Sequence, residues 1–396
     1  PLGARFSVDA ALAAPSASKQ RVNRIFTVAS TTIALQLLAM YLVSAVLKTG
    51  PSWHAHGSAI HLALHHESFA TSFGQWFREL PTPWLQGMTW SVYYLELLGT
   101  LLFFSPYKPG WTRTAQVLLF MSFHFGLFLC MELGHFPWVA LGAWLFMLPS
   151  WFWDVPVHRA LLKLDLNRRY LALAAVARGF VTQHREWFRT RKSHALRIDP
   201  TPWGTFAAAV LAVYVAYGTA YAATHKGNVE GDQFNPMLML RLYANWGMFA
   251  PNPPNTSGWF VIVGERANGS EIDVWNDKDP VDWTRPELPS ATYRSQRWRK
   301  FLDNITNSRH AVVRPYFLRW LCKDWNESHD EAERVRALTL YQMARTTQWP
   351  AKGYSEVKKN NLQRQGCPSL GGKADPSPRK PSSGKAKAAG GERSKR

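Results

Sequence analysis

The chain has 396 residues, of which 46% are hydrophobic and 14% aromatic, and it contains 19 tryptophans. Such an excess of aromatic rings is typical of membrane proteins, because indole and phenol side chains favour the interface between lipid and water. The formal net charge of +19 would suit a nucleic-acid binder. The basic residues are divided among separate loops and a tail, however, so no single basic patch forms and we expect no nucleic-acid partner.

Five stretches are apolar over nearly the length that a transmembrane helix requires, which is about 20 residues. They cover residues 25–47, 84–104, 114–131, 136–153 and 203–223. The fourth is short, but tryptophans near both of its ends are typical of a tight span. The sequence therefore predicts a mainly α fold, in which residues 25–153 and 203–223 form a polytopic bundle of about five transmembrane helices.

The distribution of positive charge predicts the orientation of these stretches. A segment rich in Arg and Lys, residues 159–197, lies between the fourth and fifth stretches, and a smaller basic group precedes the first. Because basic loops stay on the cytoplasmic side, we expect residues 1–24 to be a cytoplasmic lead-in. Residues 154–202 are expected to form a basic connector on the inner membrane surface. With five crossings, everything after residue 223 is extracytoplasmic.

The external loop 49–83 joins the first two stretches and is rich in histidine. The histidines near its start are His54, His56, His61, His65 and His66. The pattern predicts an amphipathic helix at the membrane interface, followed by a proline-rich turn. His61 and His65 fall on one face of that helix, as two metal ligands would. Only Glu67 is placed to complete such a site, so we favour interfacial rings and expect no metal.

Beyond the fifth stretch, the pattern changes to that of a small extracytoplasmic α+β domain, residues 224–350. Two short apolar runs surround Asn268-Gly269, a pair typical of tight turns, and predict a β-hairpin. Three charged amphipathic patterns predict helices further on. They cover residues 293–305, 309–323 and 330–347. A basic tail, residues 351–396, is too poor in apolar side chains to fold and is expected to be disordered.

The chain has three cysteines, Cys130 in an apolar stretch and Cys322 and Cys367 in the C-terminal part. They show neither a CxxC motif nor the spacing of a zinc site. Cys322 and Cys367 lie in the region expected outside the cytoplasm, where a disulfide is chemically permitted. Nothing in the local sequence requires the pair, so the sequence alone leaves it open.

Four ionisable residues lie within or at the ends of the apolar stretches, where a charge is costly and is therefore a candidate functional group. They are Lys48, Glu96, His124 and Glu132. Each also has a plain structural explanation. Lys48 can anchor its helix by reaching the headgroups, Glu96 and His124 can hydrogen-bond neighbouring helices, and Glu132 can cap a helix at the interface. Spacing alone does not decide between a site and a scaffold.

The spacing of these residues has a counterpart in a known family. Lys48 is followed five residues later by Trp53, and the pair Phe123-His124 is followed by Gly134 and Phe136. With Glu96 in the intervening stretch, this order over residues 24–153 resembles the HTTM domain of vitamin K-dependent gamma-glutamyl carboxylase and its bacterial relatives. Two later segments, TyrAlaAsnTrpGlyMetPheAlaPro and SerGlnArgTrpArgLysPhe, also look like the region that follows the membrane domain in this family.

The resemblance implies an integral membrane enzyme that acts at the outer, luminal membrane face. In the family, a Lys deprotonates reduced vitamin K, and dioxygen converts the quinol into a strong base that ends as the epoxide. That base removes a γ-hydrogen from glutamate, and the carbanion captures carbon dioxide. By position, Lys48 would be the initiating base, and Trp53, Glu96 and His124 would support the quinone or substrate site. Glu132 is a further candidate for that site, because the external ends of the first and third stretches place Lys48 and Glu132 at a similar depth. The implied cofactor is a vitamin K or menaquinol-type quinone, and the implied partners are the lipid bilayer and a glutamate-containing protein or peptide.

The setting of Lys48 agrees with that role. An exposed ammonium has a pKa of about 10.4 and cannot act as a base at neutral pH, but desolvation lowers the pKa of a buried Lys by several units. The alternative function is a non-enzymatic HTTM-domain protein, a membrane scaffold or lipid-binding partner. The two differ in whether Lys48, Glu96 and His124 converge on one cavity or Lys48 points into water.

Overall fold

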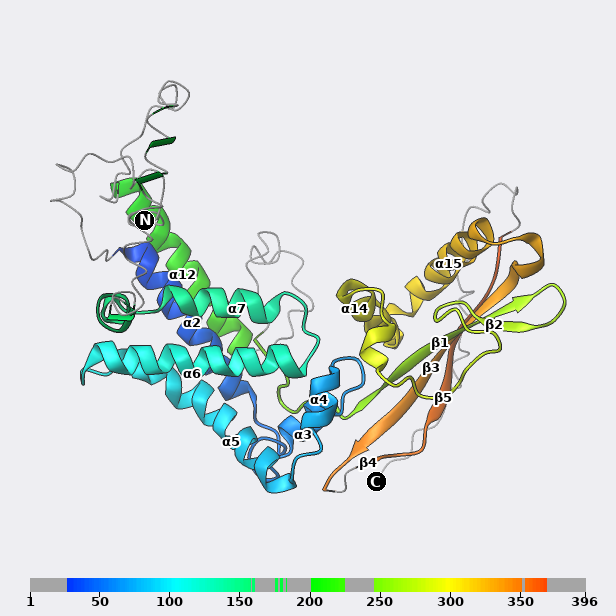
Figure 1. The fold of residues 1–396 in the computed structure, drawn as a ribbon, viewed down its shortest axis with the longest axis horizontal. Coiled ribbons are helices and arrows are strands. Elements are labelled where there is room, and N and C mark those ends of the chain that lie inside the picture. The colour runs from blue at the N-terminus through cyan, green and yellow to red at the C-terminus, as the bar shows by residue number, and fades with distance from the viewer. Residues whose placement is uncertain are drawn as a thin grey trace, which may run out of the picture. The chain divides into compact units, whose positions relative to one another are not determined.

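The computed structural model describes residues 27–157, 159–160, 175–176, 179–180, 183, 201–224, 246–350 and 353–368. The expected lead-in 1–24, nearly all of the basic connector 154–202 and the tail beyond residue 368 lie outside these residues. Within them, helices dominate the first part of the chain and a curled antiparallel sheet the last (Figure 1). The structure is mainly helical, as the sequence predicts.

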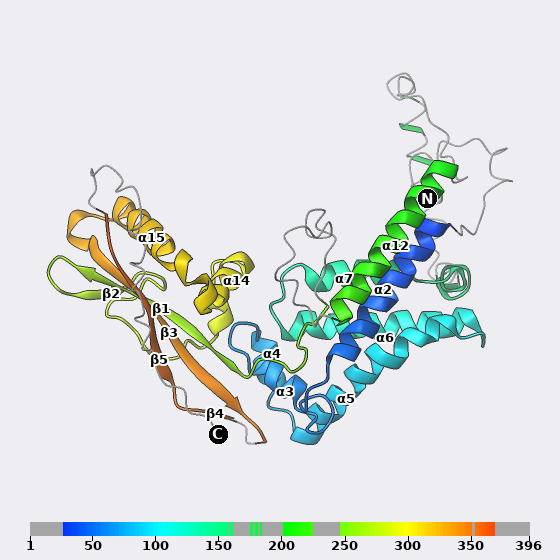
Figure 2. The ribbon, with the colours of Figure 1, turned by 180° about the vertical axis from the view of Figure 1, so that it is seen from behind.

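The first apolar stretch forms helix α2, Val28–Leu47. Thr27 and Ser30 cap its start reciprocally, because each side chain accepts a hydrogen bond from the other residue's backbone N–H. The helix ends at Lys48, its C-cap residue. Helix α2 packs against α12, Pro202–Thr224, which comes from the fifth stretch. Figures 1 and 2 both show α2 and α12 side by side.

The other apolar helices complete the core around α2. Helix α5, Thr82–Leu98, continues as a 3₁₀ turn, η2, Gly99–Phe104, and packs against α2. Helix α6, Pro109–Cys130, begins with a proline, whose missing N–H needs no partner at that position. It packs against α7, Phe136–Phe146. In the buried core that α2, α6 and α7 share, Phe120 stacks on Trp144 with ring centroids 4.2 Å apart.

Three described helices are long and apolar enough to cross a membrane. They are Val28–Leu47, Pro109–Cys130 and Pro202–Tyr221. The expected span 136–153 is not one helix, because α7 has only 11 residues, a length of about 17 Å. A separate short helix, α8, Ser150–Phe152, starts after Pro149 and leads into a π-helical turn, Trp153–Val157. Proline disfavours the helical conformation at the residue before it, which separates α7 from α8.

The loop 49–83 does not contain the expected interfacial helix. It forms two short helices, α3, Ala59–Leu64, and α4, Ser72–Phe77. Most side chains of α3 are buried, His61 among them, because this helix packs against α5. The prediction was wrong because an apolar, histidine-containing pattern does not reveal whether its face meets lipid or protein.

The C-terminal part folds around a five-stranded sheet with the order β2-β1-β3-β4, in which β5 also pairs with β3. The predicted hairpin is confirmed. Strand β1, Thr256–Arg266, pairs antiparallel with β2, Glu271–Asp273, and places Val263 opposite Asp273. At the turn, Gly269 has a φ of 85°, which glycine adopts without steric cost.

Two of the three helices predicted in this part are present. They are α14, Gln296–Ile305, and α15, Arg314–Ser328, which is preceded by a 3₁₀ turn, η5, Ser308–Val313. Two shorter 3₁₀ turns, η4, Pro289–Thr292, and η6, Glu331–Glu333, lie before and after this helical pair.

The helix predicted over residues 330–347 is wrong, because this segment is strand β3, Val335–Gln348, followed by the two-residue strand β4, Gly353–Tyr354. Leu338 and Leu340 are both fully buried, and their two-residue spacing is that of one face of a strand. The tail predicted from residue 351 contains strand β5, Lys358–Gly366, so this part is ordered. A disulfide joins Cys322 to Cys367 directly after it, which answers the question that the sequence left open.

The chain forms two compact units. The first comprises residues up to 259, 285–301 and 343–358, and the second comprises residues 260–284, 302–342 and those from 359 onward. The most deeply buried large side chains of the second unit are Ile262, Leu302, Ile305, Leu318, Leu321, Leu338 and Leu340. Every residue of the sites described below belongs to the first unit.

Candidate functional site

Lys48 lies at the end of α2 and is buried, with only 3% of its surface exposed. Its ammonium forms an ion pair with the carboxylate of Glu96 on α5, which is 4% exposed. It also donates a hydrogen bond of 2.9 Å to the hydroxyl of Ser44, which lies one helical turn earlier and therefore on the same face. A Lys that anchors a helix in the headgroups would extend into water, so the anchor interpretation does not describe this side chain.

An aromatic pocket has Trp53 as one of its walls, and the Trp53 ring in turn contacts Lys48, although neither Lys48 nor Glu96 lines the pocket. Lys48 Nζ lies 4.8 Å from the centroid of the Trp53 ring, and Trp53 lines a pocket of about 320 Å³. The pocket is lined by Trp53, His54, Trp90, Tyr93 and Tyr94. His54 bonds through Nε2 to the Lys48 carbonyl at 2.7 Å and meets the Tyr93 ring edge to face at 4.7 Å. This lining suits a flat, largely apolar ring system with a polar edge.

His124 belongs to a different hydrogen-bonded group, which joins α2, α6 and α7. The Trp144 indole donates to the Tyr41 hydroxyl at 3.0 Å, and that hydroxyl lies 2.5 Å from His124 Nε2. Since the Tyr41 oxygen accepts from Trp144, its own proton is free to be donated to His124. Tyr41 is seven residues before Lys48, two turns along the same face of α2 and roughly 10 Å away along the helix axis.

The structure therefore brings together some of the residues that the sequence singled out. Lys48, Glu96 and Trp53 lie in contact, whereas His124 contacts Tyr41, which lies two helical turns before Lys48 on α2. Glu132 is exposed, and its backbone N–H, not its carboxylate, is engaged by donating to the Phe69 carbonyl at 2.6 Å. Glu132 was expected at a depth similar to that of Lys48, but it lies outside the site. The chain leaves α6 at Met131 in an extended conformation, which places Glu132 on the surface.

Comparison with known families identifies the membrane part. Residues 3–151 match the family model of the HTTM domain. The chain contains an HTTM domain. The HTTM domain defines the family that includes vitamin K-dependent carboxylase. The matched residues include Lys48, Trp53, Glu96 and His124. No curated protein and no solved structure matches the chain.

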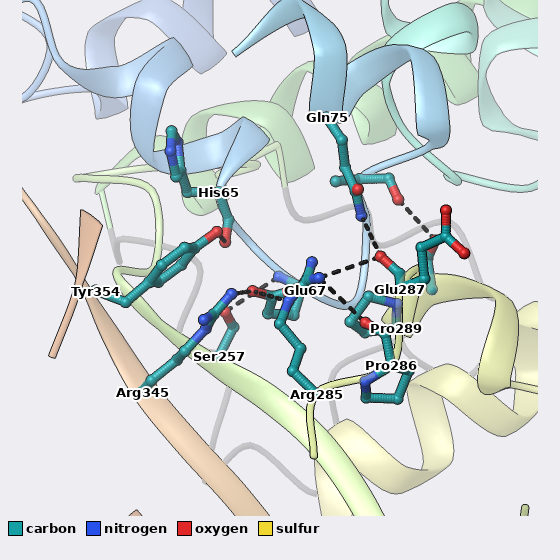
Figure 3. Close-up of polar contacts among 12 residues, drawn as sticks. His65, Glu67, Gln75, Ser257, Arg285, Pro286, Glu287, Pro289, Arg345 and Tyr354 are labelled. Carbon is teal, nitrogen blue, oxygen red and sulfur yellow. Dashed lines mark hydrogen bonds and ion pairs between the residues drawn. The ribbon is translucent and has the colours of Figure 1, made fainter. Parts of the chain in front are cut away.

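The loop 49–83 of the HTTM domain also carries Glu67, the centre of a polar cluster that was not predicted from the sequence. Glu67 is 1% exposed and lies between two guanidinium groups (Figure 3). The Arg285 Nε donates to both carboxylate oxygens, at 3.2 Å to Oε1 and 3.1 Å to Oε2, and its Nη2 donates to Oε2 at 2.8 Å. Arg345 forms a second ion pair with Oε1. The backbone N–H of Glu67 donates to the Ser257 hydroxyl at 3.1 Å. The Arg residues follow Glu67 by more than 200 positions, so no local sequence signal marks the cluster.

Burial and charge act in opposite directions on Glu67. Burial alone would raise the pKa of its carboxyl group, but the hydrogen bonds and charges of Arg285 and Arg345 outweigh burial and lower that pKa below its usual range. Glu67 is therefore ionised at neutral pH. Guanidinium groups keep their protons in proteins, so the charges of this cluster are fixed.

Aromatic and imidazole rings surround the cluster. The Arg345 guanidinium lies 3.3 Å from the centroid of the Tyr354 ring, and Arg78 donates to the Tyr354 hydroxyl at 2.9 Å. Burial lowers the pKa of His65 to about 3, with the charge of His61 acting in the same direction, and lowers the pKa of His66 to about 4. Both histidines are therefore neutral at physiological pH.

The histidine-rich loop shows packing between rings and not a set of converging ligands. The His61 and His65 rings lie 4.0 Å apart, and His65 donates through Nδ1 to the His61 carbonyl at 2.8 Å. Among the residues that the structure describes, no group of three or more His, Cys, Asp or Glu side chains is arranged to hold a metal ion.

Proposed function

We propose that this HTTM-domain protein is an integral membrane enzyme that couples oxygenation of a reduced quinone to γ-carboxylation of glutamate, as vitamin K-dependent carboxylase does. The observation that carries the proposal is the buried Lys48–Glu96 ion pair beside an aromatic pocket. A plain anchor or scaffold needs neither a buried amine nor a pocket next to it. The family match supports the reaction class, because the HTTM domain is found in that carboxylase family.

The Lys48–Glu96 pair gives a physical route to a neutral amine. In surroundings of low polarity, separated charges are costly, so a buried acid and amine share one proton with little net charge in either arrangement. When the proton is on Glu96, Lys48 is a free amine that can accept the proton of a quinol hydroxyl. The ammonium that forms is then balanced by the charge of the quinolate, and oxygens of Glu96 and Ser44 accept hydrogen bonds from it.

The residues around Lys48 fit a reduced naphthoquinone. The rings of Trp53, Trp90, Tyr93 and Tyr94 line the pocket and offer stacking surfaces for a flat ring system. When bound, the quinol together with dioxygen supplies the strong base that removes a γ-hydrogen. The atoms balance as reduced quinone, dioxygen, carbon dioxide and a glutamyl residue giving quinone epoxide, γ-carboxyglutamyl residue, water and one proton.

The proposal includes the location of the second unit outside the cytoplasm. The Cys322–Cys367 disulfide supports this location, because disulfides form and persist in oxidising compartments and are rare in the cytosol. The Arg- and Lys-rich segment between the fourth and fifth stretches supports the same orientation. After reduction, a thiol reagent that does not cross membranes should modify Cys367 in sealed, right-side-out vesicles. Modification only after the vesicles are opened would contradict this orientation.

The function can be tested with the full chain in lipid nanodiscs. Purified protein is incubated with a reduced naphthoquinone, dioxygen, labelled bicarbonate and a glutamate-containing peptide, and both the epoxide and the labelled peptide are measured. Lys48→Ala should reduce epoxide formation by about 100-fold or more, the usual contribution of a positioned base. Lys323→Ala, which removes an exposed Lys from α15, should leave epoxide formation unchanged.

Three outcomes would contradict the proposal or a part of it. Equal epoxide formation by the wild type and Lys48→Ala would remove Lys48 from the chemistry. Saturable binding of the quinone by a wild-type protein that forms no epoxide would instead favour a lipid-binding or scaffold protein. Epoxide formation without labelled peptide would retain the quinol reaction and contradict the carboxylation.

A further inference from the structure

The turn that carries Trp53 is held by a distant part of the chain. Three hydrogen bonds join residues 50–53 to the four-residue segment Phe249–Asn252. Gly50 N–H donates to the Pro251 carbonyl at 3.0 Å, and the Trp53 indole donates to the Phe249 carbonyl at 3.0 Å. Ser52 N–H donates to the Asn252 side-chain carbonyl at 3.1 Å. All these residues lie in the first unit.

The fit between the two segments is close at Gly50 and at Phe249. A Cβ atom on Gly50 would collide with the Asn252 amide, so only glycine permits this approach. Phe249 has a φ of 60°, a left-handed conformation that is costly for a bulky residue and persists only where the surroundings impose it. This conformation belongs to the residue whose carbonyl holds the Trp53 indole.

We infer that the segment Phe249–Asn252 positions the Lys48 site by fixing the Trp53 ring against the Lys48 ammonium. The inference rests on the proposed function of Lys48. Trp53 has its ring near Lys48 Nζ on one side and its N–H on the Phe249 carbonyl on the other, so its orientation depends on both contacts. The same ring forms one wall of the aromatic pocket, so the segment also sets the shape of that pocket.

Asn252 is the residue through which this inference can be tested. Its side chain contacts the Ser52 backbone and not the Lys48–Glu96 pair, so it is a positioning residue. Asn252→Ala removes the acceptor for Ser52 N–H, whereas Asn252→Asp keeps an acceptor oxygen at that place. Asn255→Ala is the matched control, because the Asn255 side chain is exposed and, among the described residues, accepts a single weak bond of 3.4 Å, from the neighbouring Thr256.

Hydrogen exchange measured by mass spectrometry on the full chain in nanodiscs reports the contact directly. In peptides covering residues 48–56, Asn252→Ala should speed exchange by about 3- to 10-fold, the effect of one lost hydrogen bond. Asn252→Asp and Asn255→Ala should leave the exchange at the wild-type rate. Unchanged exchange in Asn252→Ala, or equal acceleration in all three variants, would overturn the inference.

The second readout is quinol turnover with the same variants. Asn252→Ala should raise the KM for reduced naphthoquinone by about 3- to 10-fold, and Asn252→Asp should restore it, because the pocket wall depends on the acceptor oxygen. A wild-type KM in Asn252→Ala would overturn the inference. If the wild type forms no epoxide while Asn252→Ala still speeds exchange, the proposed function fails and the contact between the two segments stands.

Discussion

Two buried carboxylates of the first unit, Glu67 and Glu96, are neutralised in different ways. Glu67 lies between Arg285 and Arg345 and receives at least four hydrogen bonds from them. Glu96 is paired with one amine, that of Lys48, next to a pocket. Guanidinium groups do not release protons in proteins, whereas a buried amine does so readily. The Glu67 cluster therefore has fixed charges, and the Lys48–Glu96 pair has a movable proton.

The difference separates a structural use of charge from a chemical one. Arg285 and Arg345 hold the carboxylate by several directed bonds, which fixes the loop 49–83 to residues distant in the sequence. Lys48 makes fewer directed bonds, which costs stability but leaves the amine able to react. Exchanging Lys and Arg between the two places should expose the difference.

The largest expected effect follows from Lys48→Arg. Arg keeps a positive charge for Glu96 but cannot act as a base, so epoxide formation should fall by about 100-fold or more. The converse change, Arg285→Lys in the Glu67 cluster, should weaken the cluster and leave turnover per folded molecule unchanged. Both rates are measured with reduced naphthoquinone and normalised to folded protein. Full activity in Lys48→Arg would show that only the charge at this position matters.

Removing the Glu67 carboxylate should cause the largest loss of stability. Glu67→Ala leaves the guanidinium groups of Arg285 and Arg345, which are 23% and 12% exposed, without their anion. This loss costs up to about 3–5 kcal/mol in the free energy of unfolding, the range for a fully buried pair that is broken. Glu79→Ala is the control, because the Glu79 carboxylate is 62% exposed in its ion pair and such pairs contribute at most about 1 kcal/mol. Unfolding in denaturant checks both values. Equal, small losses would show that the Glu67 cluster is not the stabilising element described here.

The sequence predicted local elements correctly where a strong local signal, such as a long apolar run or an Asn-Gly turn, is present. The apolar run before Lys48 gave α2, and Asn268-Gly269 gave the hairpin of β1 and β2. Residues 330–347 were wrongly predicted as a helix, because charged residues interrupt the strand alternation. Pairing with β1 and β5 decides the conformation there, and those partners are distant in sequence.

For the site, the sequence could name residues but not their contacts. Lys48, Trp53 and Glu96 were singled out by spacing and resemblance, and the structure places them together. Glu132 was expected at the same depth, but the extended chain after α6 leaves it exposed. Arg285, Arg345 and Asn252 were missed, because each acts on a residue about 200 or more positions away. Such contacts depend on tertiary packing and leave no periodic signal.

A smaller effect is expected from Tyr41→Phe, which tests whether the Tyr41 group belongs to the site or to the scaffold. The change removes the acceptor for the Trp144 indole and the partner of His124 Nε2, at a cost of about 1–3 kcal/mol for buried groups left unpaired. Turnover per folded molecule should stay at the wild-type value if the group is scaffold. A large fall in turnover would place His124 and Tyr41 with Lys48 in the chemistry. Phe120→Leu, a change of packing in the same core without loss of a hydrogen bond, is the matched control.

The smallest expected effect is a change of the free energy of unfolding with pH, caused by His65 and His66 beside the Glu67 cluster. The folded pKa of His65 is about 3 and that of His66 about 4, below the ordinary value of 6.5, because burial disfavours the charged ring. The unfolded chain therefore binds protons that the folded chain does not, and stability falls as the pH drops below 6.5. Each group contributes at most about 1.4 kcal/mol per pH unit. Glu67 adds its own loss only near and below its ordinary pKa of 4.5. Between pH 6.5 and 4.5 the slope therefore comes from groups other than Glu67, and a substitution of one histidine is needed to measure that ring's share.

Unfolding free energies measured at several pH values in that window, with His65→Gln, test this assignment. The variant should lose one histidine's share of the slope, whatever its overall stability, because Gln does not titrate. His56→Gln, which changes an exposed ring of the same loop, should keep the wild-type slope. A wild-type protein equally stable at pH 6.5 and pH 4.5 would show that these rings are hydrated. The loop beside the Glu67 cluster would then lack the dry packing that the burial of His65 and His66 indicates.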